Sequence, residues 1–441
     1  MPQSSRLASS ENSEQSAFTQ AGVLHFAFYH HEPFPPFSLE QLHAGDARYG
    51  GSVARLRLLF SLADRGHRVT LVGNVQEGEW KGVHALKGDP GLAEVLSAPA
   101  AETTLILNNL PPPVRWGQIL RLKSPSNRVI AWVGNHLNSR WLRSLARGEL
   151  DRAVCVSRWH REQYRVYPGF ERIEASYSGV DTDLMRGGTP TVFREPTALF
   201  TSVPRRSKGF HHVLRAWSRV RRVCPTARLR VCGSVSMHVP NGVGGKTGVL
   251  DPDLEAEFPE WFGDPPGSHQ SVGIDLMGAR SLGDVYRDLR GATIAVVNCN
   301  WRGSTETYCR AAVEAQVAGI PVVGAAAGSL TEVVANGKTG LLVDRPDPAK
   351  LADAMVTLLQ DDSLRRQMAS AGPAWARPLA EYALIAGDWE AIVRRSWRGE
   401  PAAVSPSSFH DFLRRVGYGR ARTWMRERLR ETQFLEQDRV P

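Results

Sequence analysis

The sequence predicts an α/β protein with two doubly wound, Rossmann-like domains that face each other across a cleft. From about residue 21, short runs of β-branched residues alternate with longer amphipathic stretches, and this alternation is typical of parallel sheets covered by helices. The alternation occurs in two series, and 441 residues are too many for one hydrophobic core. The segment Gly187–Pro196, which contains two glycines and two prolines, separates the series, so we expect it to be the linker.

The first series predicts a domain over residues 21–190. Its expected strands are Val23–Tyr29, Val69–Gly73, Thr104–Leu107, Val129–Val133 and Ala153–Val156, and its helical patterns include Ser52–Arg65 and Arg158–Tyr167. In this fold class ligands bind beyond the carboxyl ends of the strands, so functional residues are expected in the loops at that edge.

The second series predicts a domain over residues 191–375. Its expected strands are Ala198–Val203, Leu229–Cys232, Ile274–Met277, Ile294–Val297, Val322–Ala325 and Leu341–Val343, and its helices include Phe210–Val223, Tyr308–Val317 and Ala349–Leu359. A further helix is expected within residues 376–400, around Pro378–Arg395.

Three segments do not follow the alternation. Residues 1–20 are rich in Ser, Gln and Glu and have no apolar stretch, which indicates a disordered leader and not a signal peptide. Residues 235–272 are rich in Gly, Pro and acidic groups and are expected to form a long insertion, with a flexible part at residues 241–248. Residues 401–441 predict a basic helical tail, which is either a solvated helix or a contact with a membrane surface.

Composition excludes several classes of protein. The net charge of +9 is spread along the chain, whereas nucleic-acid binders usually concentrate it, so we expect no nucleic-acid partner. No apolar run reaches the roughly 18 residues of a membrane span. The five cysteines form no C-x-x-C pair, which disfavours disulfides and structural zinc and favours a reducing cytoplasm. A membrane contact of the tail would place the protein at the inner membrane face.

Two patterns resemble ligand motifs but favour simpler interpretations. Residues 241–248 read NGVGGKTG, but a P-loop would require glycine at the position of Pro240. Asp181 and Asp183 have the D-x-D spacing of some metal sites, yet no further ligand stands at a suitable spacing, so a turn or helix cap is expected.

The strongest chemical pattern is the pair Glu306 and Glu314. We expect both on one helix capped by Ser304 or Thr305, which would place them about 12 Å apart along its axis. The acid and base of a glycosidase lie closer, so hydrolysis is disfavoured. Carboxylates at this distance suit the sugar hydroxyls of a long ligand whose diphosphate lies at the helix amino end.

Two loops add groups suited to phosphate. Arg205, Arg206 and Lys208 follow the predicted strand Ala198–Val203, where they would neutralise a diphosphate. Gly50 and Gly51 stand at a helix start, where the absence of side chains lets a phosphate approach the backbone, although a plain turn explains them equally well.

Taken together, these motifs resemble the retaining, GT-B-fold glycosyltransferases of family 4, also called group 1 glycosyltransferases. The resemblance covers roughly residues 21–398. It is most specific in the second half, where the following motifs occur in the family's order: Glu306 and Glu314 as E-x7-E, AGIPVV at 318–323, TEVV at 331–334 and NGKTGLLV at 336–343. The first half adds Gly50–Gly51, Arg65–Thr70, Val156–Ser157 and Ser178–Asp181.

The resemblance implies roles for individual residues. Glu314 would hold the ribose hydroxyls, Glu306 would face the donor sugar, and Lys208 would contact the diphosphate under a loop containing Gly50 and Gly51. The donor would also contact the segment Thr307, Tyr308, Cys309 and Arg310. Such enzymes work without a metal or another cofactor, and their retention of configuration is usually explained by front-face attack, which requires no enzyme nucleophile.

The chain also departs from the family pattern. Val203 stands where the family usually has arginine, so Arg205 or Arg206 would have to replace it. Thr307, Tyr308 and Cys309 replace a G-F-G, and Cys309 is either a reactive thiol or, as we favour, a buried inert one. Asn108 and Asn109 occupy the place of a common histidine, so His136 is the candidate acceptor-side group, with an ordinary structural histidine as the alternative.

The sequence therefore predicts a glycosyltransferase that moves a hexose from a nucleotide sugar to an acceptor hydroxyl on a glycan, a lipid-linked molecule or a small molecule. The donor would bind the second domain and the acceptor the first. Two alternatives stay open: a nucleotide-sugar epimerase or hydrolase on the same fold, and a non-catalytic nucleotide-sugar-binding protein.

Overall fold

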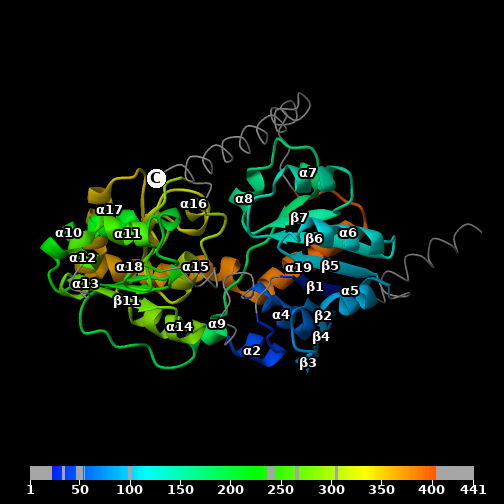
Figure 1. The fold of residues 1–441 in the computed structure, drawn as a ribbon, viewed down its shortest axis with the longest axis horizontal. Coiled ribbons are helices and arrows are strands. Elements are labelled where there is room, and N and C mark those ends of the chain that lie inside the picture. Colours follow the sequence, from blue (N-terminus) through cyan, green and yellow to red (C-terminus); the bar gives the residue numbers. More distant parts are fainter. Residues whose placement is uncertain are drawn as a thin grey trace, which may run out of the picture.

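The computed structural model of the chain describes residues 22–31, 35–45, 53, 55–97, 102–235, 244–263, 268–302 and 306–403 (Figure 1). It contains two sheets, one of eight strands and one of six. Each sheet has helices packed on it, and the two lie side by side along the long axis of the molecule. The fold class is that predicted from the alternation of strands and helices.

The first sheet has the strand order β3-β4-β2-β1-β5-β6-β7-β8 and is parallel except for the β3–β4 pair. Its strands are β1 His25–His30, β2 Arg68–Gly73, β3 Gly78–Trp80, β4 Val83–Lys87, β5 Thr103–Asn108, β6 Asn127–Val133, β7 Arg152–Cys155 and β8 Ile173–Ala175. Its helices are α2 Leu39–Ala44, α4 Leu58–Asp64, α5 Gly88–Ser97, α6 Pro113–Leu122, α7 Ser139–Ala146, α8 Arg158–Glu162, η1 Phe170–Arg172 and α9 Thr182–Arg186.

The second sheet is parallel throughout and has the order β11-β10-β9-β12-β13-β14. Its strands are β9 Thr197–Phe200, β10 Arg228–Cys232, β11 Ile274–Gly278, β12 Ile294–Val296, β13 Val322–Ala325 and β14 Gly340–Val343. The helices of this half are η2 Arg206–Lys208, α10 Phe210–Val223, α11 Pro252–Glu257, α12 Pro259–Phe262, α13 Ser268–Ser271, α14 Leu282–Gly291, α15 Arg310–Val317, α16 Leu330–Val333, α17 Pro348–Gln360 and α18 Asp362–Ala380.

The strand order changes direction at one place in each sheet. In the second sheet, β10 and β11 lie on one side of β9, and β12 to β14 lie on the other. Loops that leave the carboxyl ends of β9 and β12 therefore turn away from each other, which opens a ligand-binding position between them. In the first sheet the same change occurs between β1 and β5.

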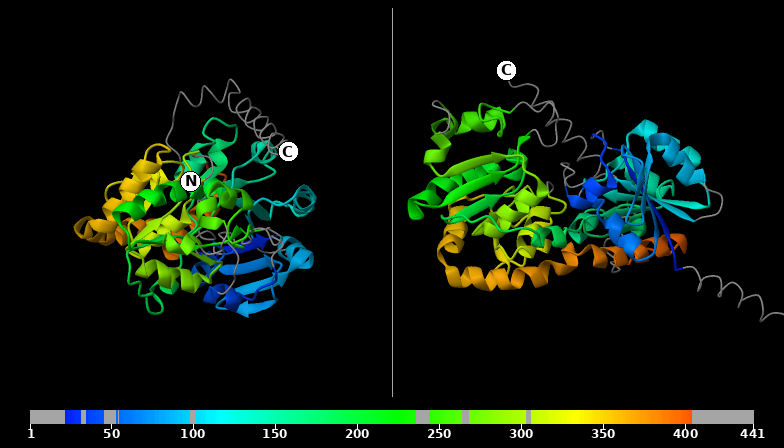
Figure 2. Two further views of the ribbon diagram at one scale, coloured as in Figure 1. Left: turned by 60° about the vertical axis from the view of Figure 1, so that its left-hand side comes forward. Right: turned by 90° about the horizontal axis from the view of Figure 1, so that it is seen from below.

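Helix α19 (Tyr382–Trp397), the last helix of the described residues, returns to the first domain. Trp389 packs against Trp132 with ring centroids 5.0 Å apart, and Arg395 pairs with the buried Glu174 at 3.0 Å. Figure 2 shows α18 and α19 following one another along one side of the molecule, beneath both domains. Apolar burial thus joins α19 to the first sheet.

The segment expected to be the linker is attached to the second domain. The Arg290 guanidinium of α14 donates to the carbonyl oxygens of Arg186 at 3.1 Å and Gly188 at 2.7 Å. The Thr191 hydroxyl donates to Asp288 at 2.6 Å. The loop before α9 also contacts the end of α18, since the Val180 amide donates to the Ala380 carbonyl at 2.8 Å.

The expected flexible insertion is folded where the structure describes it, in residues 244–263 and 268–272. Leu250 and Leu254 are fully buried, and Phe258, Trp261 and Phe262 join the same core as α10 and α17. The prediction of a flexible segment was wrong because the acidic and glycine residues that suggested it alternate with these apolar side chains. Residues 1–20 and 404–441, the expected leader and nearly all of the tail, lie outside the described residues.

Within the described part of the chain, no helix has both the length and the apolar content to cross a membrane.

Candidate functional site

Lys208, Glu306 and Asn298 meet where the strand order of the second sheet changes direction. Lys208 lies in the loop after β9, and the other two residues follow β12. The Lys208 Nζ lies 3.0 Å from Glu306 Oε2, and the Asn298 amide donates to the same oxygen at 2.7 Å. A cation and a carboxylate are therefore held side by side at the edge where this fold class binds ligands.

The close approach of the two loops depends on Gly209. Its φ is +70°, and a Cβ atom at this position would lie 2.1 Å from the Cys299 carbonyl carbon. The Cys299 amide donates to the Lys208 carbonyl at 3.1 Å, and the Asn300 side chain donates to the Ser207 carbonyl at 2.9 Å. Glycine thus lets the β9 loop lie on the β12 loop and brings Lys208 to Glu306.

The pKa of Lys208 is raised. Burial lowers the pKa of this ammonium, but the Glu306 carboxylate outweighs that effect through its charge and its hydrogen bond. The ammonium is therefore charged at neutral pH and is available to a phosphate group.

Glu306 does not lie on the helix that carries Glu314, contrary to the sequence prediction. Helix α15 begins at Arg310 and its N-cap is Cys309, which makes no side-chain capping bond; Ser304 and Thr305 lie outside the described residues. The Glu306 carbonyl instead accepts from the Ser329 amide at 3.0 Å. The expected 12 Å separation along one helix axis therefore does not apply, because tertiary contacts hold residues 306–309 as a loop.

Glu314 lies on α15 and is 6% exposed. Its Oε1 accepts from the Tyr286 hydroxyl at 3.1 Å and from the Arg310 Nε at 2.7 Å. Burial raises the pKa of Tyr286 strongly, and the Glu314 carboxylate adds to the effect, so the tyrosine stays a neutral donor. Glu314 is thus a buried carboxylate oriented by two neighbours.

Arg205 and Arg206 contact the folded insertion. Arg205 donates to the Val235 carbonyl at 2.9 Å and lies 3.6 Å from Asp251. Arg206 pairs with Glu257, which also accepts from Arg215 at 2.6 Å. Of the three cations predicted at this strand end, Lys208 is the one that contacts Glu306.

The side chains at 307, 308 and 310 make contacts that the sequence did not predict. The Thr307 hydroxyl donates to the Gly134 carbonyl of the first domain at 2.6 Å. The buried Tyr308 donates to the Leu379 carbonyl at 3.0 Å, and Arg310 donates to the Gly179 carbonyl at 2.9 Å. These three side chains therefore fasten the loop to its surroundings.

Cys309 is buried, as the favoured interpretation of the sequence required. Burial raises the pKa of its thiol to about 12, and the neighbouring Glu306 carboxylate acts in the same direction. The alternative of a reactive, low-pKa thiol is therefore wrong.

This conclusion predicts slow thiol chemistry. All five cysteines are buried, so the native protein at pH 8 is expected to react negligibly with Ellman's reagent over several minutes. Unfolding in guanidinium should release all five thiols, which serves as the control. Rapid release of one thiol from the native protein, lost in Cys309→Ser, would contradict the inert assignment.

His136 lies in the loop between β6 and α7. Its Nδ1 is 3.1 Å from the Tyr164 hydroxyl, and its ring lies 5.1 Å from that of the fully buried His160. Gly134, which binds Thr307, is two residues away along the chain. The histidine thus lies on the loop of the first domain that the Glu306 loop contacts, whereas Gly50 and Gly51 lie outside the described residues.

Asn109 also lies at the carboxyl edge of the first sheet, directly after β5. It has a φ of +79°, which is uncommon for a residue other than glycine. Its side chain accepts from the buried Arg55 at 2.8 Å. Strained backbone of this kind is often found at functional sites.

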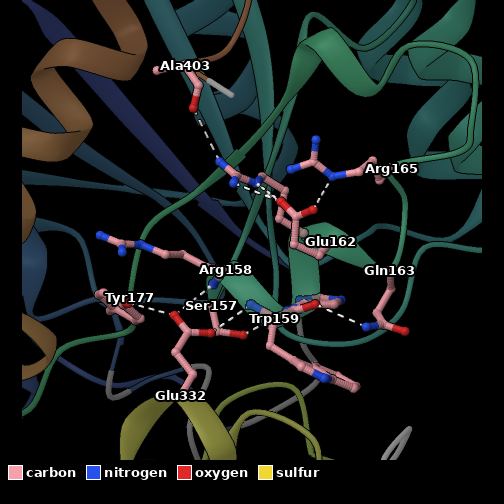
Figure 3. A network of polar contacts seen from close by, with 11 residues as sticks. Ser157, Arg158, Trp159, Glu162, Gln163, Arg165, Tyr177, Glu332 and Ala403 are labelled. Atoms are coloured by element: carbon pink, nitrogen blue, oxygen red, sulfur yellow. Dashed lines mark hydrogen bonds and ion pairs between the residues drawn. The ribbon is translucent and has the colours of Figure 1, made fainter. Parts of the chain in front are cut away.

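Two functional candidates were missed by the sequence analysis. Asn298 is 3% exposed and orients Glu306, and its signal was an amide directly after a buried strand. Glu332 belongs to the second domain and caps α8 of the first: its carboxylate accepts from the amides of Arg158 at 3.1 Å and Trp159 at 2.7 Å (Figure 3). The Tyr177 hydroxyl donates to the same carboxylate at 2.6 Å. No local pattern in the sequence indicates this long-range contact.

The two misleading motifs have structural explanations. The Glu255 carboxylate accepts from the amides of Lys246 at 2.6 Å and Thr247 at 3.0 Å, so a side chain occupies the loop that resembles a phosphate-binding motif. Asp181 is the N-cap of α9 and also pairs with Arg57. Among the residues that the structure describes, no three His, Cys, Asp or Glu side chains group as they would to hold a metal ion.

Comparisons with known proteins agree with this geometry. Residues 186–375 match the family model for glycosyl transferases group 1. A D-inositol 3-phosphate glycosyltransferase of Frankia alni is 28% identical over 255 residues, which are 54% of this chain and 55% of that protein. One from Corynebacterium efficiens is 52% identical over 63 residues, 14% of this chain and 15% of that protein. The chain thus spans about half or less of the length of these curated relatives.

Solved structures resemble a larger part of the chain. Sucrose-phosphate synthase from Thermosynechococcus elongatus has a TM-score of 0.63 at 16% identity, covering 86% of this chain and all of that one. Anabaena Alr3699/HepE in complex with UDP-glucose has a TM-score of 0.58 at 15% identity, covering 85% of this chain and all of that one. These likenesses show the fold, and the family match covers the site around Lys208 and Glu306. The chain therefore has the GT-B fold, and its residues 186–375 match the group 1 glycosyl transferases.

Proposed function

We propose that this protein is a retaining glycosyltransferase that moves a hexose from a nucleotide-diphosphate sugar to a hydroxyl group of an acceptor. The observation that carries the proposal is the contact of Lys208 and Asn298 with Glu306 between β9 and β12, inside the segment that matches the family. A cation beside a carboxylate suits a ligand that presents both a phosphate group and sugar hydroxyls.

Each residue near this contact has a role in the proposal. Glu314 accepts hydrogen bonds from the ribose, Glu306 faces the donor sugar, and Lys208 stabilises the charge that develops on the departing diphosphate. The amino end of α15 adds a favourable potential for that diphosphate. The acceptor attacks from the side on which the diphosphate leaves, so no enzyme nucleophile is needed.

The first domain would bind the acceptor, with His136 on the acceptor side. Arg205 and Arg206 join the donor site only if they exchange Asp251 and Glu257 for phosphate oxygens. The loop with Gly50 and Gly51 would close over the donor, and closure would exclude water from the reaction.

The names of the similar proteins supply the first compounds to test. UDP-glucose is bound in the Anabaena structure, and D-inositol 3-phosphate is named in the curated relatives. A thermal-shift screen of UDP-, GDP-, ADP- and TDP-sugars should identify the donor by a concentration-dependent rise in Tm. Product analysis by NMR would then show whether the anomeric configuration is retained.

Two other functions give different results in the same experiment. An epimerase or hydrolase on this fold would consume the donor rapidly without an acceptor. A non-catalytic binding protein would bind the donor, yet produce no transfer across a broad panel of acceptors. Rapid turnover of donor alone, or binding with no transfer, would refute the transferase proposal.

We also propose that transfer requires no metal ion, since Lys208 and the α15 amino end would supply the positive potential. The rate of transfer in excess EDTA is therefore expected to stay within about twofold of the untreated rate. The same assay with added Mg²⁺ or Mn²⁺ is the control. A loss of activity in EDTA that Mg²⁺ restores would show that a cation takes part.

The tail 401–441 is proposed as a peripheral membrane contact, because its sequence combines a basic helical pattern with aromatic residues. Cosedimentation with vesicles containing anionic lipid should be lost when the tail is removed or when salt is raised. Equal binding to neutral and anionic vesicles would contradict an electrostatic contact. A confirmed contact would place the protein in the cytoplasm, at the inner membrane face.

A further inference from the structure

We propose that Thr307 is a positioning residue that fixes the donor-side loop against the acceptor-side loop. The donor loop is residues 306–309, and the acceptor loop is residues 134–137, which contain His136. The inference rests on the proposed function, and it assigns to Thr307 a role other than the donor contact expected from its place beside Glu306.

Thr307 makes two short hydrogen bonds to the first domain. Its hydroxyl donates to the Gly134 carbonyl at 2.6 Å, and its own carbonyl accepts from the Ser157 hydroxyl at 2.6 Å. Gly134 follows β6, and Ser157 follows β7. One residue of the donor loop thus touches both loops at the carboxyl edge of the acceptor-side sheet.

The groups that Thr307 contacts are themselves held in place. The fully buried Ser157 caps α8 by accepting from the His160 amide at 3.0 Å. A Cβ atom at Gly134 would lie 3.2 Å from the Arg55 Nη1 and 3.3 Å from the Asn109 Oδ1, so this loop is packed against the Arg55–Asn109 contact. Both partners are held by their neighbours, so hydrogen bonds to Thr307 fix the position of the donor loop relative to the acceptor loop.

The position of Thr307 in the sequence places its hydrogen bond between the donor site and the acceptor loop. The preceding residue, Glu306, contacts Lys208 and Asn298 in the donor site. On the other side of the bond, His136 lies two residues after Gly134. The hydroxyl of Thr307 therefore links the carboxylate proposed to face the donor sugar with the loop proposed to face the acceptor.

Substitutions at Thr307 can separate the effect of its hydroxyl from the effect of its shape. Valine has nearly the shape of threonine but lacks the hydroxyl, whereas serine keeps it. We expect Thr307→Val in the full chain to raise the KM for D-inositol 3-phosphate and lower kcat, with kcat/KM falling about tenfold. The Kd for UDP-glucose, measured by calorimetry, should change less than twofold. Thr307→Ser should recover most of the lost kcat/KM.

Thr357→Val is the matched control, because its hydroxyl donates to the Asp353 carbonyl on the exposed surface of α17. Its kinetics should equal those of the unchanged protein. Wild-type kinetics in Thr307→Val would overturn the proposal. So would a loss of UDP-glucose affinity equal to the loss of kcat/KM, since Thr307 would then act on the donor.

A second measurement separates this inference from the proposed function. Small-angle X-ray scattering of the ligand-free proteins should give Thr307→Val a larger radius of gyration than Thr307→Ser and Thr357→Val. If the unchanged protein transfers no sugar, the proposed function fails, but the scattering comparison still tests the bond. Identical scattering curves for all variants would then refute the role of Thr307 in holding the loops together.

Discussion

Replacing Lys208 by alanine is expected to lower kcat by about 100-fold to 1000-fold while changing donor affinity much less. The ammonium lies beside Glu306 at the switch point of the second sheet and is charged at neutral pH, since its pKa is raised. Negative charge on the diphosphate grows as the sugar bond breaks, so a fixed cation stabilises the transition state more than the bound donor. Removing one preorganised group of this kind costs about 3–4 kcal/mol in other enzymes.

The measurement is kcat and KM for the donor in Lys208→Ala, with Lys350→Ala as the control. Lys350 is an exposed lysine of α17 that lies 3.5 Å from Asp344, so its removal tests the general effect of losing one surface charge. Thermal unfolding of both variants would show whether the loss of the Glu306 contact disturbs the fold. Unchanged kinetics in Lys208→Ala would remove this residue from the mechanism.

Glu314→Gln is expected to weaken donor binding by about 1.5–3 kcal/mol, because hydrogen bonds to a charged carboxylate are worth about that much. This corresponds to about tenfold to 150-fold in Kd. Glutamine keeps the shape of the side chain and an oxygen that accepts from Tyr286 and Arg310. Alanine would leave Arg310 without its carboxylate and would mix a loss of stability with the loss of binding.

Calorimetry with the donor checks this prediction, and Glu381→Gln is its control. Glu381 follows α18 and accepts from Arg377 at 3.1 Å, so its carboxylate pairs with an arginine four residues away, as Glu314 does with Arg310. Its substitution should leave the donor Kd unchanged. A Glu314→Gln protein that is folded and binds the donor as tightly as before would contradict the ribose assignment.

Local sequence patterns were sufficient for the helices and strands that carry a strong periodicity. Helix α10 occupies the residues expected for it, and β13 does the same, since apolar spacing and β-branched content act within the element. The hairpin of β3 and β4 was missed. Strand β3 has three exposed residues, so it presents no alternation to recognise.

Errors arose where neighbours in space decide a conformation. Residues 306–309 could extend helix α15 if helix propensity alone decided their conformation. Three hydrogen bonds hold them as a loop instead: Thr307 to Gly134, Tyr308 to Leu379, and Cys309 to Ser329. The predicted flexibility of the insertion was wrong for the same reason. Glycine and proline indicate a lack of regular structure, which is not the same as a lack of packing.

The sequence by itself determined the class of the fold, predicted the match of its second half to the group 1 glycosyl transferases, and nominated Glu306, Glu314 and Lys208 as candidate site residues. Those conclusions depend on residue type and spacing, which are properties of the chain. Only the tertiary structure decided that Lys208 faces Glu306 while Arg206 faces Glu257, and that Thr307 and Glu332 reach the first domain. Such pairings join residues about 50 to 175 positions apart. They depend on where each loop leaves its sheet, and no local pattern carries that information.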